Sequence, residues 1–381
     1  MPTTYPPRIE PSATIRMGDR ARELAAAGAD VINLGSGSPD FTSPDHVNEA
    51  ATAALEAGHT QMAATAGVPE LREAIAEKLA RDNGIEADPA DVGVTPGSKF
   101  ALYAAVLSLV REGDEVVLLD PCWVSYEAMV DLAGGDLTRV RLDADTGFSL
   151  SDVDLAAAVS DDTRALVLNN PSNPTGRVFS RAELERVRDL AVEHDFWVVA
   201  DEIYERMTYG AEHTSVAALD GMADRTVTAN GFSKAYAMSG WRLGYFTGPS
   251  DVVDAVQTIQ SQTVSSATTF AQHAAVAALR GPQAPVEAMR RTYDERIGAA
   301  MDVLRDAGVD VPRPEGAFYL FVPVAGDDDV AVAESILDEH RVATTPGSAF
   351  GVPGYVRIAC TVPEDRLTEG VGRITDHLAS P

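Results

Sequence analysis

The chain has 381 residues, 45% of them hydrophobic, which exceeds the usual size of one hydrophobic core and predicts two closely packed subdomains. Acidic residues outnumber basic residues by 58 to 30, and the formal net charge of −28 argues against a nucleic-acid partner or an anionic membrane surface. Charged residues near the N-terminus and the lack of any apolar run of about 18 residues lead us to expect a cytoplasmic protein without a membrane span.

Cysteine and lysine are both scarce. Cys122 and Cys360 lack the spacing of metal ligands and cannot build a disulfide framework, so we expect two small packed side chains and no metal site. Lysine occurs only at positions 78, 99 and 234. An acidic, lysine-poor surface suits a protein in concentrated salt, where counterions screen self-repulsion, so we expect a halophilic source. The alternative is an ordinary acidic protein.

The first strong helical pattern is LREAIAEKLA, whose mixed charges predict an exposed helix face that carries Lys78. From about residue 92 to 247, short apolar runs alternate with helical patterns, which predicts a largely parallel sheet with helices on both faces. The expected strands are VGVT, DEVVLLD, LTRVRL, TRALVLNN, FWVVADEI and DRTVTANGF. Gly and Pro residues follow several of these strands, so we expect binding loops at the carboxyl ends.

The C-terminal part has a different character. A long helical region from about 284 to 308 precedes three expected strands, AFYLFV, RVATTP and YVRIAC, and a final helix from about residue 363. We expect residues 286–381 to form a smaller α+β domain together with the N-terminal segment 1–40. Residues 41–285 would then form the large domain.

The segment GFSKAYAMSGWRLGYF at 231–246 carries the strongest chemical signal. Lys234 lies in a turn-prone, mostly uncharged stretch just after a strand, with Arg242 eight residues further on. Desolvation lowers the pKa of a lysine and so supplies a neutral amine for imine formation, whereas arginine offers planar donors to a phosphate. The alternative for this lysine is an ordinary surface position beside a strand end.

A second candidate site is TPGSKF, where a strand ends and a helix begins. Free backbone N–H groups at such a helix start suit a phosphate dianion, with Gly97, Ser98 and Lys99 forming the turn. The spacing differs from that of a nucleotide P-loop, and GSGSPD lacks the third glycine of a dinucleotide fingerprint.

Several pieces in this order resemble the class I aminotransferases, which belong to fold type I of the pyridoxal-phosphate enzymes, and most closely their prokaryotic aspartate aminotransferase branch. The pieces are GSGSPDF, AGVPELREAI, TPGSKFAL, PCWVSYEAMV, NNPSNPTG, VVADEIY, SKAYAMSGWRLGY, PEGAFY and YVRIA. The resemblance implies a large domain with a mostly parallel seven-stranded sheet flanked by helices, a smaller α+β domain, pyridoxal 5′-phosphate as cofactor, and a homodimer with active sites at its interface.

The resemblance also implies roles for single residues. Lys234 would carry the cofactor as a Schiff base and move the substrate's α-proton. Asp201 would pair with the pyridine nitrogen, and Tyr204 and Asn173 would bond the cofactor's phenolic oxygen. Trp123 would stack on the cofactor ring, and Trp123 and Asn173 would also border the substrate. Taken alone, Asn173 is equally a turn residue.

The remaining implied roles concern anions. Gly97, Ser98, Ser233 and Arg242 would hold the phosphate, with Lys99 beside them. A two-point contact from Arg357, with the backbone of Gly37, would bind the substrate's α-carboxylate.

Substrate preference depends mainly on Lys99, which would reach the distal carboxylate of aspartate or glutamate, near the hydroxyls of Ser12 and Thr14. The alternative is a Lys99 that faces solvent at the phosphate turn. Two positions depart from the family pattern: Met62 replaces a tyrosine that reaches the partner's phosphate, and Ser38 replaces a common acidic residue.

We therefore expect amino transfer from an L-amino acid, aspartate or glutamate, to a 2-oxo acid such as 2-oxoglutarate. A lyase or synthase of the same fold is the alternative, because the cofactor residues are shared. A regulatory protein that keeps the fold as a binding module is a third possibility, which the negative charge and the lack of an added DNA-binding domain disfavour.

Overall fold

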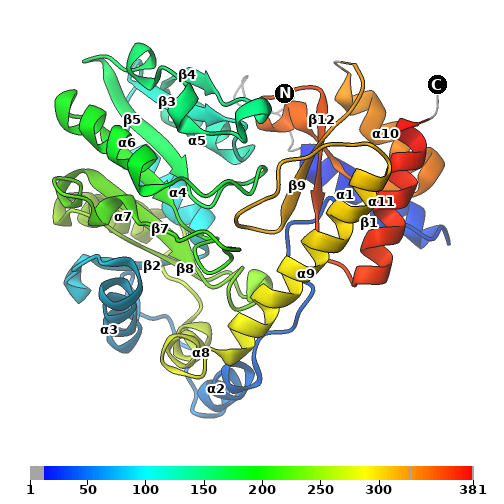
Figure 1. The fold of residues 1–381 in the computed structure, drawn as a ribbon. Helices are drawn as coiled ribbons and strands as arrows, with labels where there is room; N and C mark the ends of the chain where they lie inside the picture. Colours follow the sequence, from blue (N-terminus) through cyan, green and yellow to red (C-terminus); the bar gives the residue numbers. More distant parts are fainter. Residues whose placement is uncertain (1–12, 327, 380–381) are drawn as a thin grey trace, which may run out of the picture.

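A computed structural model describes residues 13–326 and 328–379 of the chain. Figure 1 shows a large α/β layer at one end of the molecule and a smaller group of strands and helices at the other. The large layer is a seven-stranded sheet in the order β2-β8-β7-β6-β5-β3-β4. Its strands are β2 (Val92–Thr95), β3 (Glu115–Asp120), β4 (Asp136–Arg141), β5 (Thr163–Asn169), β6 (Trp197–Asp201), β7 (Thr226–Gly231) and β8 (Gly244–Thr247).

The sheet is parallel except for β8, which runs antiparallel to both of its neighbours, β2 and β7. Its central strands are buried along almost their whole length, as expected of strands covered on two faces. Alternate residues pack into different cores: Val116 and Leu118 face one side of the sheet, and Val117 and Leu119 face the other. The predicted fold class is therefore confirmed.

Helices cover both faces of this sheet. Side chains of α4, α5 and α7 pack on one face, and side chains of α6 pack on the other. The helices of the chain are α1 (Ala13–Ala26), α2 (Asp45–Glu56), α3 (Pro69–Lys78), α4 (Ser98–Leu109), α5 (Ser125–Ala133), α6 (Arg181–Glu193), α7 (Ser250–Thr263), α8 (Thr269–Arg280), α9 (Ala284–Asp306), α10 (Asp329–His340) and α11 (Glu364–Leu378). A capping box of Ser180 and Glu183 fixes the start of α6.

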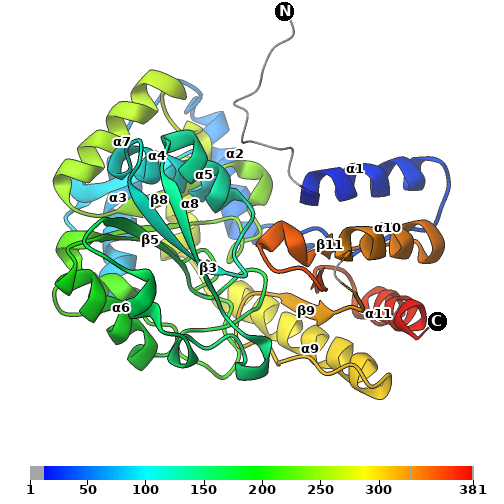
Figure 2. The same cartoon turned by 90° about the horizontal axis from the view of Figure 1, so that it is seen from above.

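The smaller group combines both ends of the chain. A three-stranded antiparallel sheet, β11-β12-β9, consists of β9 (Tyr319–Pro323), β11 (Thr345–Pro346) and β12 (Tyr355–Ala359). Close to the N-terminus, β1 (Ile32–Asn33) pairs in parallel with β10 (Val342–Ala343). In Figure 2, α1 and α10 lie side by side, and the long helix α9 runs along the same group. The division into segments 1–40, 41–285 and 286–381 stays a prediction.

One local prediction is wrong. Lys78, expected on a solvent-exposed helix face, is only 3% exposed and forms an ion pair with Glu205. The last turn of α3 continues as a π-helical turn, η1 (Leu79–Asn83), which brings Asn83 to the same ion pair. The charge pattern around Lys78 therefore did not reveal that this residue is buried, because its partner Glu205 comes from a distant part of the chain.

Two other expectations concern single residues. Both cysteines are buried and free, as expected for small packed side chains. Met62, which departs from the family pattern, is 78% exposed.

Within the described residues, no helix is both long enough and apolar enough to cross a membrane.

Candidate active site

A cavity of about 560 Å³ lies where the carboxyl ends of the parallel strands meet the smaller group of strands. This volume falls within the ordinary range for small-molecule sites. The residues that border it are Ile15, Gly37, Ser38, Ser98, Lys99, Trp123, Val124, Ser125, Tyr126, Asn169, Asn173, Asp201, Ile203, Tyr204, Ser233, Lys234, Ser239, Gly240, Arg242, Tyr319 and Arg357.

Sheet topology explains why residues far apart in sequence meet here. Asn169 ends β5 and Asp201 ends β6, and these two residues are register partners in neighbouring parallel strands. Lys234 follows the end of β7, which is the next strand in the sheet. Arg357 comes from β12 in the smaller sheet, so both parts of the molecule contribute walls.

Lys234 is buried at the centre of the site. Its Nζ donates a hydrogen bond to the carbonyl oxygen of Gly37 at 2.5 Å. Burial lowers the pKa of this amine to about 8, and the positive charge of Arg357 adds to the effect. More of the amine is therefore neutral near neutral pH than for an ordinary lysine, and only the neutral form can attack a carbonyl carbon.

Asp201 is buried and held from two sides. The hydroxyl of Tyr126 donates to Asp201 Oδ2 at 2.7 Å, and the backbone N–H of Ile203 donates to Oδ1 at 3.2 Å. Burial raises the pKa of Asp201 to about 6, although these two donors favour the ionised form. Burial also keeps the pKa of Tyr126 well above its usual value, so Tyr126 remains a donor.

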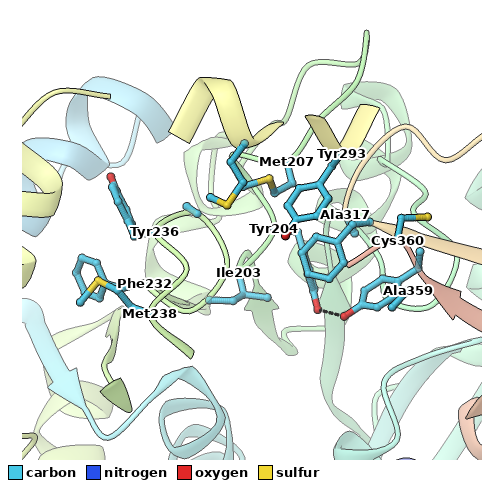
Figure 3. Close-up of a cluster of buried hydrophobic side chains, with 14 of the residues drawn as sticks. Ile203, Tyr204, Met207, Phe232, Tyr236, Met238, Tyr293, Ala317, Ala359 and Cys360 are labelled. Carbon is cyan, nitrogen blue, oxygen red and sulfur yellow. Dashed lines mark hydrogen bonds between the residues drawn. The ribbon is translucent and has the colours of Figure 1, made fainter. Parts of the chain in front are cut away.

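Tyr204 stands between the centre of the site and the smaller sheet. Its hydroxyl shares a 2.8 Å hydrogen bond with the hydroxyl of Tyr319, the dashed line at Tyr204 in Figure 3. Burial raises the pKa of Tyr204 well above the usual range, so this pair is neutral. The Tyr204 ring also lies 5.6 Å from Lys234 Nζ, measured to the ring centroid.

Arg357 is a buried cation without an acidic partner among the described residues. It is 2% exposed, and its guanidinium donates to Asn173 Oδ1 at 3.0 Å and to the carbonyl oxygen of Gly35 at 2.7 Å. Its Nε has no hydrogen-bond partner. Burial lowers the pKa of Arg357, which reflects the cost of an uncompensated buried charge. An anion that enters the cavity would remove this cost.

A second group of cationic and N–H donors lies at the start of α4. Gly97 has φ +88°, and a side chain there would meet the Arg242 guanidinium at 2.5 Å, so the turn and this arginine are in close contact. Gly244 is equally constrained, because a Cβ at that position would overlap the backbone nitrogen of Ser98. Arg242 itself has φ +55°, a conformation that is rare outside glycine and often found at functional sites.

Lys99 borders the cavity, although its side chain is also exposed to solvent. Its Nζ is 4.7 Å from the centroid of the Trp123 ring, within the range of a cation–π contact. Burial, together with repulsion from Arg242, lowers the pKa of Lys99. No ion pair is found for Lys99 in the part of the chain that the structure describes.

The structure brings nearly all the predicted site residues to one cavity. Gly97 does not border the cavity but supports it through Arg242. Ser12 and the side chain of Thr14 lie outside the described residues.

Sequence reasoning missed Tyr126 and Tyr319. Tyr126 stands one helical turn after Trp123, a spacing that places both on the same side of the α5 start and could have indicated it.

The charges of the side chains around the cavity indicate which kind of ligand it can bind. Among the described residues, four cations, Lys99, Lys234, Arg242 and Arg357, border the cavity together with one carboxylate, Asp201. A ligand with at least two anionic groups would balance them, one at the α4 turn and one at Arg357. The buried amine between these two places could react with a carbonyl group.

The fold and this site agree with comparisons to known proteins. Residues 29–374 match the family described as aminotransferase class I and II. An aspartate/prephenate aminotransferase from Cereibacter sphaeroides is 42% identical, over 96% of this chain and 96% of that protein. An aspartate aminotransferase from Geobacillus stearothermophilus is also 42% identical, over 96% of each chain. The solved aspartate aminotransferase of Thermus thermophilus with maleate has a TM-score of 0.95 and 40% identity, over 99% of this chain and 100% of its own.

An α/β fold with a reactive amine between two anion-binding groups defines an enzyme that acts on small anionic carbonyl and amino compounds. The chain belongs to the class I and II aminotransferase family, and it is a transaminase. Its reaction moves an amino group between an amino acid and an oxo acid. The sequence prediction of an aminotransferase is therefore confirmed, and the lyase alternative is not favoured.

Proposed function

We propose that the transaminase uses pyridoxal 5′-phosphate at Lys234 and prefers dicarboxylic substrates, with aspartate or glutamate as donor and a 2-oxo acid such as 2-oxoglutarate as acceptor. The family is one that uses this cofactor. The donor set fits it: a buried amine for the aldehyde, a buried carboxylate for the ring nitrogen, and a helix start with an arginine for the phosphate.

Each residue would do a distinct part of the work. The cofactor supplies an aldehyde for imine formation and an electron-withdrawing ring. Lys234 Nζ would form the covalent link and move the proton at the substrate's α-carbon, which requires the lowered pKa. Asp201, held ionised by Tyr126, would stabilise a protonated ring nitrogen, and Tyr204 and Asn173 would bond the phenolic oxygen. Trp123 would stack on the ring and also border the substrate.

The anion-binding residues would hold the cofactor phosphate at one end of the cavity and the substrate carboxylate at the other. Gly97, Ser98, Ser233 and Arg242 would hold the phosphate at the start of α4, next to Lys99. At the other end, Arg357 and the backbone of Gly37 would bind the α-carboxylate, and Asn173 would border it.

The observation that carries the dicarboxylate proposal is a cation left without an anion, Lys99. After a phosphate at Arg242 and an α-carboxylate at Arg357, Lys99 remains on the wall as a partly desolvated positive charge. A second substrate carboxylate would compensate it. The names of the relatives point the same way, and one solved relative was obtained with maleate, a dicarboxylate.

The test is a panel of amino donors in single half-reactions, read by the absorbance of the bound cofactor. Aspartate or glutamate should convert the enzyme faster than alanine or phenylalanine at equal concentration, and 2-oxoglutarate should restore the starting spectrum. Prephenate belongs among the acceptors, because it is a dicarboxylic oxo acid and appears in the name of a relative. A preference for alanine would refute the role of Lys99.

The same protein tests the covalent anchor. Borohydride reduction and peptide mapping should place a pyridoxyl group on Lys234, and the chain offers only Lys78 and Lys99 as other lysines. A label on either of these would contradict the assignment. Consumption of many equivalents of amino acid per enzyme without any oxo acid would instead favour a lyase.

We further propose a cytoplasmic homodimer from a high-salt source, with its active sites at the dimer interface and the domain boundaries given above. Support comes from the net charge of −28 and from the exposed Met62, which stands where relatives are expected to reach a partner. Sedimentation at about 0.1 M and at several molar salt would test the dimer and its salt requirement.

A further inference from the structure

A buried polar cluster lies directly behind the residues proposed to hold the cofactor ring. Glu202 follows Asp201, and Glu205 follows Tyr204, so the two acidic residues stand on the same turn as the two proposed cofactor contacts. Glu202 and Glu205 are not among the residues that line the cavity. They meet Lys78, which ends α3 and forms an ion pair with Glu205.

Asn83 forms hydrogen bonds with most of the other residues of the cluster. Its Oδ1 accepts from Lys78 Nζ at 2.6 Å, and its Nδ2 lies 2.7 Å from Glu205 Oε2 and 3.2 Å from Glu202 Oε2. The π-helical turn η1 is what allows this reach, because it widens the end of α3. Such a turn is uncommon and often occurs at functional sites.

A third chain segment closes the cluster. The hydroxyl of Ser215 donates to Glu202 Oε2 at 2.6 Å and accepts from Asn83 Nδ2 at 2.7 Å. His213 Nε2 lies 3.3 Å from the same Glu202 oxygen. Burial alone lowers the pKa of His213, but the Glu202 and Glu205 carboxylates raise it above its usual value. Repulsion from Lys78 opposes this rise only in part.

The cluster is balanced in charge when His213 is protonated, with two carboxylates facing one ammonium and one imidazolium. Burial by itself raises the pKa of Glu205, but the Lys78 and His213 charges bring it below its usual value. Glu202, Glu205 and His213 also have the spacing of metal ligands. The Lys78 ammonium already occupies the space beside Glu205, so the geometry favours a proton-balanced cluster over a metal site.

We propose that this cluster positions the turn 201–205, and that Glu205, Asn83 and Lys78 are positioning residues for the two cofactor contacts Asp201 and Tyr204. The inference rests on the proposed function of that turn. The cluster holds the turn at Glu202 and Glu205, on both sides of Tyr204, from two segments that are remote in the sequence.

The other contacts of the turn leave this role open. Ile203 in the turn and Met207 just after it pack in the buried cluster of Figure 3, and such apolar contacts are not directional. Backbone hydrogen bonds run only within the turn and to neighbouring strands, from Glu205 N–H to the Glu202 carbonyl and from Glu202 N–H to the Ala229 carbonyl. Asp201 and Tyr204 also have partners of their own in Tyr126 and Tyr319, and the directional bonds to Glu202 and Glu205 add a restraint on the backbone that carries them.

The test compares Glu205→Gln with a matched control, Glu115→Gln. Glu115 also accepts hydrogen bonds from two side chains, Thr163 Oγ1 at 2.6 Å and Thr138 Oγ1 at 2.9 Å. It stands at the start of β3, at the end of the strand opposite to the cavity. Amide hydrogen exchange of residues 201–207 is measured in the cofactor-free proteins, and pyridoxal-phosphate dissociation constants and steady-state kinetics are measured in the loaded ones.

Glu205→Gln should speed exchange across 201–207 and weaken cofactor binding by about 10- to 100-fold, the range found when residues behind metal ligands are removed. The KM for aspartate should stay within about twofold while kcat falls, because Arg357 is not on this turn. Glu115→Gln should change none of these. If Glu205→Gln does not fold, His213→Gln, at the margin of the cluster, takes its place with the same expected directions.

Exchange and affinity equal to those of Glu115→Gln would overturn the inference. A wild-type protein that binds no pyridoxal phosphate would instead overturn the proposed function, and the exchange measurement on the cofactor-free proteins would still decide whether the cluster restrains the turn.

Discussion

Replacing Lys99 by methionine isolates the charge that we assign to substrate choice. Methionine keeps most of the side-chain length and its packing on Trp123, but it cannot bond a carboxylate. A hydrogen bond to a charged group contributes about 1.5–3 kcal/mol, and about 1.4 kcal/mol corresponds to a factor of ten. The kcat/KM for aspartate should therefore fall about 10- to 150-fold, while the value for alanine, which lacks the second carboxylate, should change much less.

The assay is the rate of cofactor conversion by each donor, with the pyridoxal-phosphate dissociation constant measured for both proteins. Burial lowers the pKa of Lys99, so its charge is costly in the free enzyme and Lys99→Met should not reduce the melting temperature. Equal losses with aspartate and alanine, together with weaker cofactor binding, would mean that Lys99 contacts the phosphate. The reasoning about a distal carboxylate would then be refuted.

Three further predictions concern the centre of the site. Arg357→Lys keeps the charge but loses the two-point contact, so the KM for every amino donor should rise about tenfold or more at unchanged cofactor absorbance; normal KM values would place the carboxylate elsewhere. Cofactor-free Lys234→Met should melt above the wild type at pH 7, because the wild-type amine has its pKa lowered to about 8 and stays charged at a cost. The difference in melting temperature should shrink as the pH rises from about 8 towards the ordinary pKa of lysine. Equal melting temperatures at pH 7 would contradict the prediction. Tyr126→Phe removes a donor to Asp201, so the pKa of Asp201 should rise above about 6 in infrared titration of the cofactor-free protein, unlike in Tyr355→Phe.

Much of the fold could be predicted because its signals are local. Buried parallel strands are continuous apolar runs, and the alternation of such runs with helical patterns marks a sheet covered on both faces. The direction of β8 could not be predicted in this way, because a short strand of four residues carries the same pattern in either direction. It depends on the partner strands, which the local sequence does not name.

Prediction of the site residues from local sequence patterns has the same limit. Lys234, Asp201 and Arg357 were found because each stands in a recognisable motif. Lys78 was placed wrongly because its burial depends on Glu205, which is 127 positions further along the chain. Tyr126 was missed for a similar reason, since its partner Asp201 belongs to a different strand. Long-range polar partners leave little trace in the pattern of one segment.

The reversed strand β8 has a further consequence for how the site is assembled. Because β8 begins at the cavity edge, beside the carboxyl end of β7, the connection from β7 to β8 spans only residues 232–243 and contains both Lys234 and Arg242. Closing so short a loop costs little chain entropy, whereas Arg357 comes from β12, which is much further along the chain. The amine and Arg242 are thus supplied by one short loop, whereas the other residues of the anion cup, Gly97 and Ser98, and the carboxylate contact Arg357 come from remote parts of the chain.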